Sequence, residues 1–226
     1  MNAILVRIGI DATAGGWNAP VDSHTLAFVY VPIPEELEDI RPGFFRPYEE
    51  TVPALTGIGV ELPCHLRGQC MHLDPDFRCL TYGDVWPRSA PISKACSGDV
   101  LVFYAGMQPV STEHASLFYA IIGYYVIDEV VPADSIAPDL WGQNAHTRRK
   151  DPAGDTVVRA RSGVSGRLKR CISIGEYRDR AYRVRRDLLK TWGGLTVNDG
   201  YIQRSGRLPS FLHPDRFLKW FERQHV

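Results

Sequence analysis

One unit of the chain, two apolar stretches joined by a polar connection, constrains the fold most. The first stretch, Val100 to Tyr104, is apolar and aromatic throughout, which is typical of a strand buried on both faces. The second, Leu117 to Val131, predicts one long strand or two short ones, with Gly123 at the break. Glycine inside a strand often marks a bulge or sharp bend, as small barrels need. We therefore expect a small, strongly bent β-barrel with its core at about 98–175.

Further strands and helices are expected around this core. Short apolar runs bounded by glycine, proline or polar residues predict strands, namely Ala3 to Ile8, Leu26 to Val31, Thr156 to Ala160 and Cys171 to Ile174. Two helices are expected, Asp179 to Trp192 and Pro214 to Gln224. Residues 32–66 are rich in Pro, Gly and acid, so irregular structure is expected there. The sequence thus predicts one α+β domain over 1–226, a PUA-like barrel with C-terminal helices (179–224) on its flank.

Composition narrows the class of protein. A chain of 226 residues with 44% hydrophobic content can bury a core without disulfides or metals. Its N-terminal apolar stretch is short and interrupted by Arg7, unlike a signal peptide, and the run Leu117 to Ile127 is too short to span a membrane. Five cysteines at irregular spacing do not form a disulfide framework. We expect a soluble, reduced, cytoplasmic protein without a membrane partner.

The formal net charge of zero hides a segregation of charge along the chain. Residues 1–140 hold seven Lys/Arg against eighteen Asp/Glu, whereas residues 141–190 hold fourteen against five. This asymmetry, dominated by arginine, indicates a polyanionic partner bound through its phosphates. The candidate nucleic-acid contacts in this tract are Arg148, Arg149, Arg159, Arg161, Arg167 and Arg170. In the alternative, the tract pairs with the acidic half within the molecule or across a dimer interface.

The segment His72-Leu73-Asp74-Pro75-Asp76 is the sharpest candidate for chemistry. Pro75 favours extended backbone at Asp74, and residues two apart in extended backbone project to the same side. His72 and Asp74 should therefore converge, with Asp76 able to join them. Such a set could hold a divalent cation or act in general acid/base catalysis. In the alternative, the two carboxylates cap backbone amides in a proline turn and His72 packs.

A second candidate is the glycine loop after the first strand, Gly9-Ile10-Asp11-Ala12-Thr13-Ala14-Gly15-Gly16. Asp11 beside Gly15 and Gly16 could present backbone N–H groups to a phosphate or sugar. The spacing matches neither a Walker loop nor a Rossmann fingerprint. The alternative is a tight turn in which Asp11 bonds to its own loop.

A third candidate is a zinc site, because five Cys and His side chains fall within sixteen residues: Cys64, His65, Cys70, His72 and Cys79. No pair among them has the spacing of a structural zinc site, and cysteine is often buried for packing alone. The sequence therefore names no metal ligands.

His146 lies beside three cations in Asn144-Ala145-His146-Thr147-Arg148-Arg149-Lys150. Adjacent positive charge disfavours protonation of an imidazole, so we expect His146 to be neutral. It could act as a base or contact a nucleobase edge or a phosphate. The alternative is an exposed loop histidine.

Seven short motifs together resemble the third nucleotide modification associated domain family. They are Ile4 to Gly16, Val31-Pro32-Ile33-Pro34-Glu35, His72-Leu73-Asp74-Pro75-Asp76, Gly98-Asp99-Val100-Leu101-Val102-Phe103, Ile122-Gly123-Tyr124, Asn144-Ala145-His146 and Arg204-Ser205-Gly206-Arg207-Leu208-Pro209. The resemblance spans most of the chain. It implies one shared functional site containing Asp11, Gly15, Gly16, His72, Asp74, Asp76, His146 and Arg204. The unit from Gly98 to Val131 also resembles the PUA-like barrels that bind RNA or modified DNA bases.

The resemblance and the arginine tract imply a nucleic-acid or nucleotide-binding protein of a DNA base-modification system. The expected catalytic candidates are His72, Asp74, Asp11 and His146; the expected nucleotide contacts are Gly15, Gly16, Asp76 and Asn144; Arg204 joins the nucleic-acid contacts. A flipped or modified base is the expected ligand, with DNA, nucleotides or RNA as partners beside other components of such a system. A metal- or acid/base-dependent enzyme, an inert reader and a structural partner-binding protein are the alternatives. No cofactor is indicated.

Overall fold

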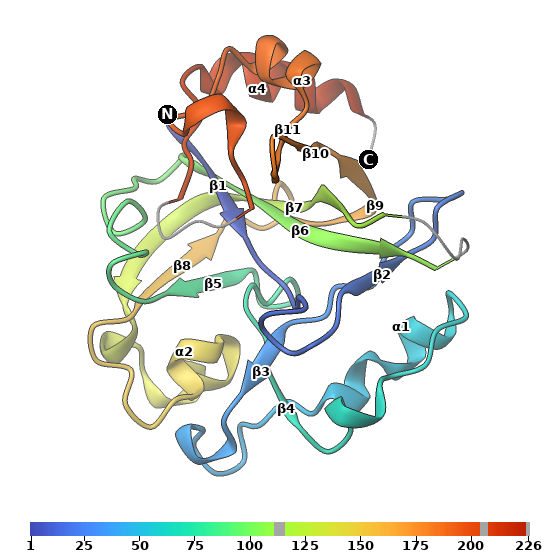
Figure 1. Cartoon of the computed structure of the whole chain (residues 1–226). Coiled ribbons are helices and arrows are strands. Elements are labelled where there is room, and N and C mark those ends of the chain that lie inside the picture. The colour runs from blue at the N-terminus through green and yellow to red at the C-terminus, as the bar shows by residue number, and fades with distance from the viewer. Residues whose placement is uncertain (111–115, 204–207, 225–226) are drawn as a thin grey trace.

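The computed structural model describes residues 1–110, 116–203 and 208–224 and combines sheets with short helices (Figure 1). Its strands are β1 (Ala3–Arg7), β2 (Ala19–Val21), β3 (Ile33–Glu35), β4 (Cys70–His72), β5 (Thr81–Asp84), β6 (Val100–Pro109), β7 (Phe118–Pro132), β8 (Thr156–Ala160), β9 (Gly166–Ser173), β10 (Gly175–Arg178) and β11 (Ala181–Val184). Its α-helices are α1 (Val52–Thr56), α2 (Ala145–Arg148), α3 (Arg186–Trp192) and α4 (Pro214–Phe221). Short 3-10 turns occupy Leu37–Asp39, Tyr48–Thr51, Cys64–Leu66, Ala133–Ser135, Pro138–Gln143, Asn198–Gly200 and Glu222–Gln224.

The two apolar stretches form the longest strands of the main sheet, β6 and β7. Its hydrogen-bonded order is β1-β6-β7-β8-β5, with β2 also beside β6 and β9 also beside β7. β1 and β2 run parallel to β6, and the other pairs are antiparallel. β7 changes partner along its fifteen residues, from β9 near Ala120 to β8 beyond Ile127. Register shifts near Gly123 accompany this change, as expected for a glycine-containing bent strand.

The main sheet is an open path. β1 and β5 stand at its two ends, and no hydrogen-bonded ladder joins them within the described residues. The mixed architecture of sheets and few helices is therefore confirmed, whereas the expected small closed barrel is not found. The likeness of residues 98–131 to PUA-like barrels stays a prediction.

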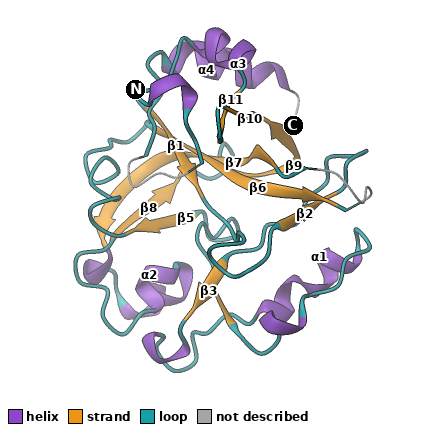
Figure 2. Ribbon diagram, viewed as in Figure 1, coloured by secondary structure: helices purple, strands orange, loops and turns teal. Residues whose placement is uncertain are grey.

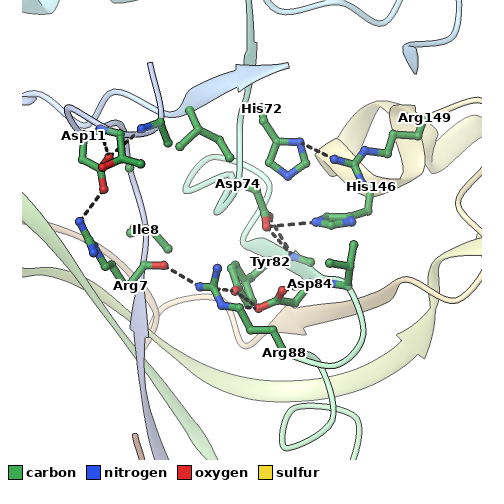
Figure 3. A pocket seen from close by; sticks show the side chains of 16 residues that line it. Arg7, Ile8, Asp11, His72, Asp74, Tyr82, Asp84, Arg88, His146 and Arg149 are labelled. Atoms are coloured by element: carbon green, nitrogen blue, oxygen red, sulfur yellow. Dashed lines mark hydrogen bonds and ion pairs between the residues drawn. The ribbon is translucent and has the colours of Figure 1, made fainter. Parts of the chain in front are cut away.

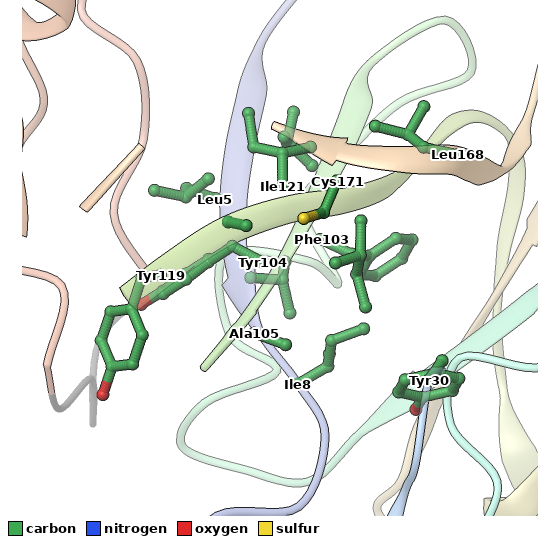
Figure 4. Close-up of a cluster of buried hydrophobic side chains, with 14 of the residues drawn as sticks. Leu5, Ile8, Tyr30, Phe103, Tyr104, Ala105, Tyr119, Ile121, Leu168 and Cys171 are labelled. Atoms are coloured by element: carbon green, nitrogen blue, oxygen red, sulfur yellow. The ribbon is translucent and has the colours of Figure 1, made fainter. Parts of the chain in front are cut away.

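The core lies around β6, which is paired between β1 and β7 in the main sheet (Figure 4). Every side chain from Val100 to Met107 is buried, as the uniformly apolar sequence predicts for a central strand. Aromatic rings from neighbouring strands pack against one another. The Phe103 and Tyr125 rings, for example, pack edge to face with centroids 4.8 Å apart. This core supplies the rigid support on which the polar segments rest.

Of the two helices predicted in the C-terminal region, the second is confirmed and the first is only partly helical. α4 confirms the second predicted helix, with Phe217 and Phe221 buried on its apolar side. Of the other predicted helix, Asp179 to Trp192, only α3 is helical, because the residues before α3 belong to the hairpin β10–β11. Asp179 and Arg180 at its turn both have positive φ (51° and 62°), as tight hairpin turns require. α3, α4 and this hairpin lie together on one side of the main sheet (Figure 1).

The opposite side of the main sheet is covered by short elements and long connections (Figure 2). β3 and β4 form a separate two-stranded sheet, and α1 and α2 flank it. The predicted strand Leu26 to Val31 is wrong: this stretch contains only an isolated bridge at Phe28, and Leu26 has a positive φ of 58°. No helix in the described part of the chain combines the length and hydrophobicity needed to cross a bilayer.

Candidate functional site

A cavity of about 490 Å³ opens where the C-terminal end of β1 meets β4, β5 and α2 (Figure 3). Its walls come from segments far apart in sequence, and most of its polar lining is ionisable. The charged and polar lining residues are Arg7, Asp11, Thr13, His72, Asp74, Tyr82, Asp84, Arg88, His146 and Arg149. Four residues expected to be catalytic, Asp11, His72, Asp74 and His146, thus face one cavity.

Asp74 is fixed by donors from two directions. The Gly83 backbone N–H donates to both carboxylate oxygens, at 2.8 and 3.0 Å, and Asn144 Nδ2 donates to Oδ1 at 3.0 Å. Both donors are buried, so they hold the carboxylate in one orientation. The side of Asp74 that carries Oδ2 remains directed at His146.

His146 is held in the first turn of α2. Asn144 caps this helix by accepting a hydrogen bond from the His146 backbone N–H at 2.8 Å. The imidazole Nδ1 lies 2.7 Å from Asp155 Oδ2, and Nε2 lies 3.6 Å from Asp74 Oδ2. Burial alone would lower its pKa, but hydrogen bonds to Asp155 and Asp74 outweigh burial and raise the pKa of His146 to about 9. The alternative of an exposed loop histidine is therefore wrong, since His146 is buried, and the raised pKa opposes the expected neutral form.

His72 lies at the end of β4 and, like His146, has a carboxylate beside its Nδ1. Its Nδ1 lies 2.9 Å from Glu35 Oε1. Antiparallel pairing places Glu35 opposite Cys70, one diagonal step from His72 on the same face. Burial opposes ionisation of Glu35, yet its bonds to His72 and Arg149 leave its pKa below the usual value. The two imidazole rings meet edge to face, with centroids 4.9 Å apart.

His72, Asp74 and His146 form what we call the open cluster. One ligand atom from each lies within 4.8 Å of the other two, and all three side chains are buried. Among the described residues, this is the group of His, Cys, Asp and Glu side chains that could hold a metal ion, and no cysteine belongs to it. The suggested zinc set of Cys64, His65, Cys70, His72 and Cys79 therefore does not come together among the described residues.

The wall beside the open cluster is a network of polar groups, of which Tyr82 and Asp84 are buried and Arg88 is half-buried. Tyr82 donates to Asp84 Oδ2 at 2.5 Å, and Arg88 Nε lies 3.2 Å from the same oxygen. Arg88 Nη2 also donates to the Arg7 carbonyl at 2.6 Å, which ties this wall to β1. Burial raises the pKa of Asp84, although the Arg88 charge opposes it.

The glycine loop contributes Asp11 to the cavity but uses most of its hydrogen bonds within itself. Asp11 Oδ1 accepts from the Thr13 and Ala14 backbone N–H groups, both at 2.7 Å, and Oδ2 pairs with Arg7. Gly15 and Gly16 have positive φ (105° and 69°) and do not line the cavity. A Cβ on Gly15 would lie 2.5 Å from the Ile10 side chain. The loop is therefore the tight turn given as the alternative, in which Asp11 bonds to its own backbone.

Asp76 and Arg148 form a second buried group, the closed cluster, outside the cavity. Asp76 Oδ2 accepts from Arg148 Nη2 at 3.0 Å, and its Oδ1 accepts from the Arg78 and Cys79 backbone amides. Both side chains are at most 3% exposed. Asp76 therefore does not join His72 and Asp74, and the Arg148 guanidinium does not reach the surface.

The other arginines of the tract divide into two groups. Arg149 lines the cavity and contacts Glu35 at 2.9 Å, and Arg159 and Arg161 pair with Glu129 and Asp128. These contacts match the alternative of pairing within the molecule. Arg167 and Arg170 on β9 are exposed and have no acidic partner in the described part of the chain. Of the candidate nucleic-acid contacts among the described residues, Arg149 lines the cavity. Arg204 lies outside the described residues.

Three residues that position the open cluster are absent from the sequence-based site. Glu35 and Asp155 stand behind the two imidazoles, and Gly83 makes room for one of them. A Cβ on Gly83 would lie 2.1 Å from His146 Cδ2. A lone glycine inside a strand often signals such close approach, whereas nothing in the sequence indicates the pairing of Glu35 and Asp155 with histidines.

Fold and cavity together define a mixed α/β protein with a buried histidine–carboxylate centre. The family described as nucleotide modification associated domain 3 matches residues 2–216, so the chain belongs to this family. Comparison with curated proteins and with solved structures finds no match.

Proposed function

We propose that this protein binds a nucleotide, or a base extruded from nucleic acid, in the 490 Å³ cavity, as one component of a base-modification system. Membership of a nucleotide modification associated family gives the biological setting. The observation that carries the proposal is a concave site of ligand-binding size lined by convergent polar groups.

The chemistry of the lining suits a nucleotide. Imidazoles, carboxylates and the Tyr82 hydroxyl can pair with the hydrogen-bonding edges of a base, which must leave the helical stack to be contacted in a pocket. Arg149 and Arg7 add cationic donors at the cavity wall that suit phosphate oxygens. Apolar surface from Ile8, Ile33 and Val85 offers contact for the base faces.

For contact with a nucleic-acid backbone, Arg167 and Arg170 are the remaining surface candidates from the arginine tract. Each phosphate contact that is removed should lower the salt dependence of binding by about one unit of slope. We expect Arg170→Ala to reduce this slope for DNA while leaving affinity for free mononucleotides unchanged.

A second candidate function is an enzyme that transfers protons to or from a base. It is favoured by the contact of two imidazoles and one carboxylate in a water-accessible cavity, an arrangement suited to general acid/base chemistry. Asp74→Asn separates the two functions. An enzyme loses product formation while ligand binding survives, whereas a reader loses only affinity.

The test is a titration of the full chain with deoxynucleoside monophosphates and with short DNA and RNA, each at several salt concentrations. Arg149→Ala and His72→Gln should each weaken binding of the preferred ligand by about tenfold or more, since each removes a charged or buried hydrogen-bonding contact. His24→Gln, in an exposed turn away from the cavity, is the matched control. Equal affinity in all variants, or no binding by the wild type, contradicts the proposal.

A further inference from the structure

Two buried histidines in this protein share an arrangement that ordinary packing does not require. In each, Nδ1 faces a carboxylate, Glu35 at 2.9 Å from His72 and Asp155 at 2.7 Å from His146. A histidine whose Nδ1–H donates to a carboxylate keeps its Nε2 lone pair available for a ligand. Metal-binding histidines almost always carry such a partner, which fixes the ring and raises its basicity.

The third member, Asp74, adds an oxygen ligand from the same side. Its carboxylate is anchored by Gly83 and Asn144, and Oδ2 lies 3.6 Å from His146 Nε2. Arg149 stands behind the site, between Glu35 and Asp155, at 2.9 and 3.4 Å from their oxygens. The three side chains of the open cluster and the two carboxylates behind them come from β3, from β4 and the residues just after it, and from α2 and the loop after it, and they converge at the cavity wall.

We propose that His72, Asp74 and His146 bind one divalent first-row transition-metal ion through the two Nε2 atoms and one carboxylate oxygen. Imidazole nitrogen suits zinc, iron, copper and nickel, whereas calcium and magnesium select sites made of oxygen alone. Three protein ligands leave coordination positions unfilled, as in catalytic rather than structural sites. Those positions face the cavity.

The dimensions of the open cluster fit this assignment. With metal–ligand bonds of 2.0–2.2 Å, tetrahedral ligand atoms lie about 3.4 Å apart. The 3.6 Å between His146 Nε2 and Asp74 Oδ2 is close to this value. The largest separation, at most 4.8 Å, must shorten by up to about 1.4 Å on binding.

A metal-free ionic triad accounts for only part of the arrangement. A protonated His146 between Asp74 and Asp155 satisfies both of its nitrogens without an ion. It leaves His72 Nε2, on a side chain that lines the cavity and is 9% exposed, without a protein hydrogen-bond partner among the described residues. A metal ion accounts for both histidines and for both carboxylates behind them.

The proposal is tested on the full chain, stripped with a chelator and titrated with Zn²⁺ by calorimetry. We expect one ion per chain. Asp155→Asn should weaken affinity by about 10- to 100-fold, as loss of a carboxylate behind a ligand does, and His72→Gln and His146→Gln should weaken it further. His24→Gln should bind as the wild type. No stoichiometric binding, or unchanged affinity in His72→Gln and His146→Gln, overturns the site.

X-ray absorption of the Zn²⁺-loaded wild type tests the ligands without any substitution. The expected spectrum contains imidazole scattering and only N/O bonds of about 2.0–2.2 Å. Sulfur at about 2.3 Å would assign the ion to Cys64, Cys70 or Cys79 and contradict the proposal. The site needs no nucleotide, so its failure leaves the proposed nucleotide binding standing, and failure of nucleotide binding leaves the site standing.

Discussion

Asp74 and Asp76 lie two residues apart, both buried, yet they belong to different kinds of cluster. Asp76, in the closed cluster, receives Arg148 and two backbone amides, and it does not line the 490 Å³ cavity. Asp74, in the open cluster, receives Gly83 and Asn144 on one side and faces His146 and the cavity on the other. A carboxylate whose partners surround it stabilises the fold, and one left open on one side is available to a ligand.

The same distinction separates the two buried arginine contacts. Arg148 is sealed against Asp76, whereas Arg149, the next residue, reaches the cavity wall with 29% of its side chain exposed. Arg148 ends α2 and Arg149 follows it in extended backbone, so these two neighbours in sequence point to different surroundings, one sealed and one open to the cavity. Substitutions should therefore separate the two properties.

The largest effect on stability is expected for Arg148→Met. It leaves the Asp76 charge buried without its main partner, and removing one member of a buried pair typically costs about 3–5 kcal/mol. Urea denaturation measures this change in the free energy of unfolding. The control is Arg159→Met, which breaks the exposed pair with Glu129 and should cost at most about 1 kcal/mol. Equal costs would remove the distinction between closed and exposed pairs.

Gly83→Ala should affect both properties. The added methyl group would lie 2.1 Å from His146 Cδ2, so the ring must move away from Asp74. We expect a loss of about 1–3 kcal/mol in unfolding free energy together with weaker Zn²⁺ binding. Gly142→Ala is the matched control, since its methyl group would meet Phe44 at an ordinary 3.5 Å. Unchanged Zn²⁺ affinity in Gly83→Ala would show that the position of His146 does not matter.

The smallest effect is expected at Asp99, a closed carboxylate at the start of β6. Its oxygens accept from the Asn2 and Cys96 backbone amides at 2.6 and 3.0 Å. Burial opposes ionisation, but these bonds lower the pKa of Asp99. A lowered folded-state pKa stabilises the protein above the unfolded value of about 3.9, and the benefit disappears as pH falls through the folded value.

Asp99→Asn should therefore cost about 0.5–1.5 kcal/mol near pH 7 and progressively less below about pH 4. Urea denaturation of both proteins at pH 7, 5 and 3 measures the difference, with an Asp134→Asn variant, in a solvent-exposed turn, as control. A difference that stays constant with pH would exclude ionised Asp99 as its source.

Sequence reasoning succeeds where local composition decides the structure. The apolar run that becomes β6 and the glycine-broken β7 are readable because burial on both faces demands such sequences. It fails at β10–β11, where Asp179 and Arg180 adopt positive φ without glycine. The charged residues around that turn read as one side of a helix, since tertiary packing rather than local preference selects the hairpin.

The open cluster was predicted only in outline. His72 and Asp74 are suggested by their spacing, but the contacts to Glu35 and Asp155 depend on strand register and on the path of the chain after α2. The buried ion pair of Asp76 with Arg148 could not be predicted either, because each side chain could equally have faced solvent or the cavity. Burial is a property of the assembled fold, and charge patterns along the chain do not encode it.

The most direct test of the central claim compares Asp74→Asn with Asp76→Asn in thermal unfolding, with and without Zn²⁺. At Zn²⁺ concentrations 100-fold above Kd, binding adds about 2.7 kcal/mol, which for a chain of this length raises Tm by about 5–10 °C. Asp76→Asn should start from a lower Tm yet keep this increase, and Asp74→Asn should lose it. Retention of the increase in Asp74→Asn, or its loss in Asp76→Asn, would contradict the assignment of the open cluster as the binding site.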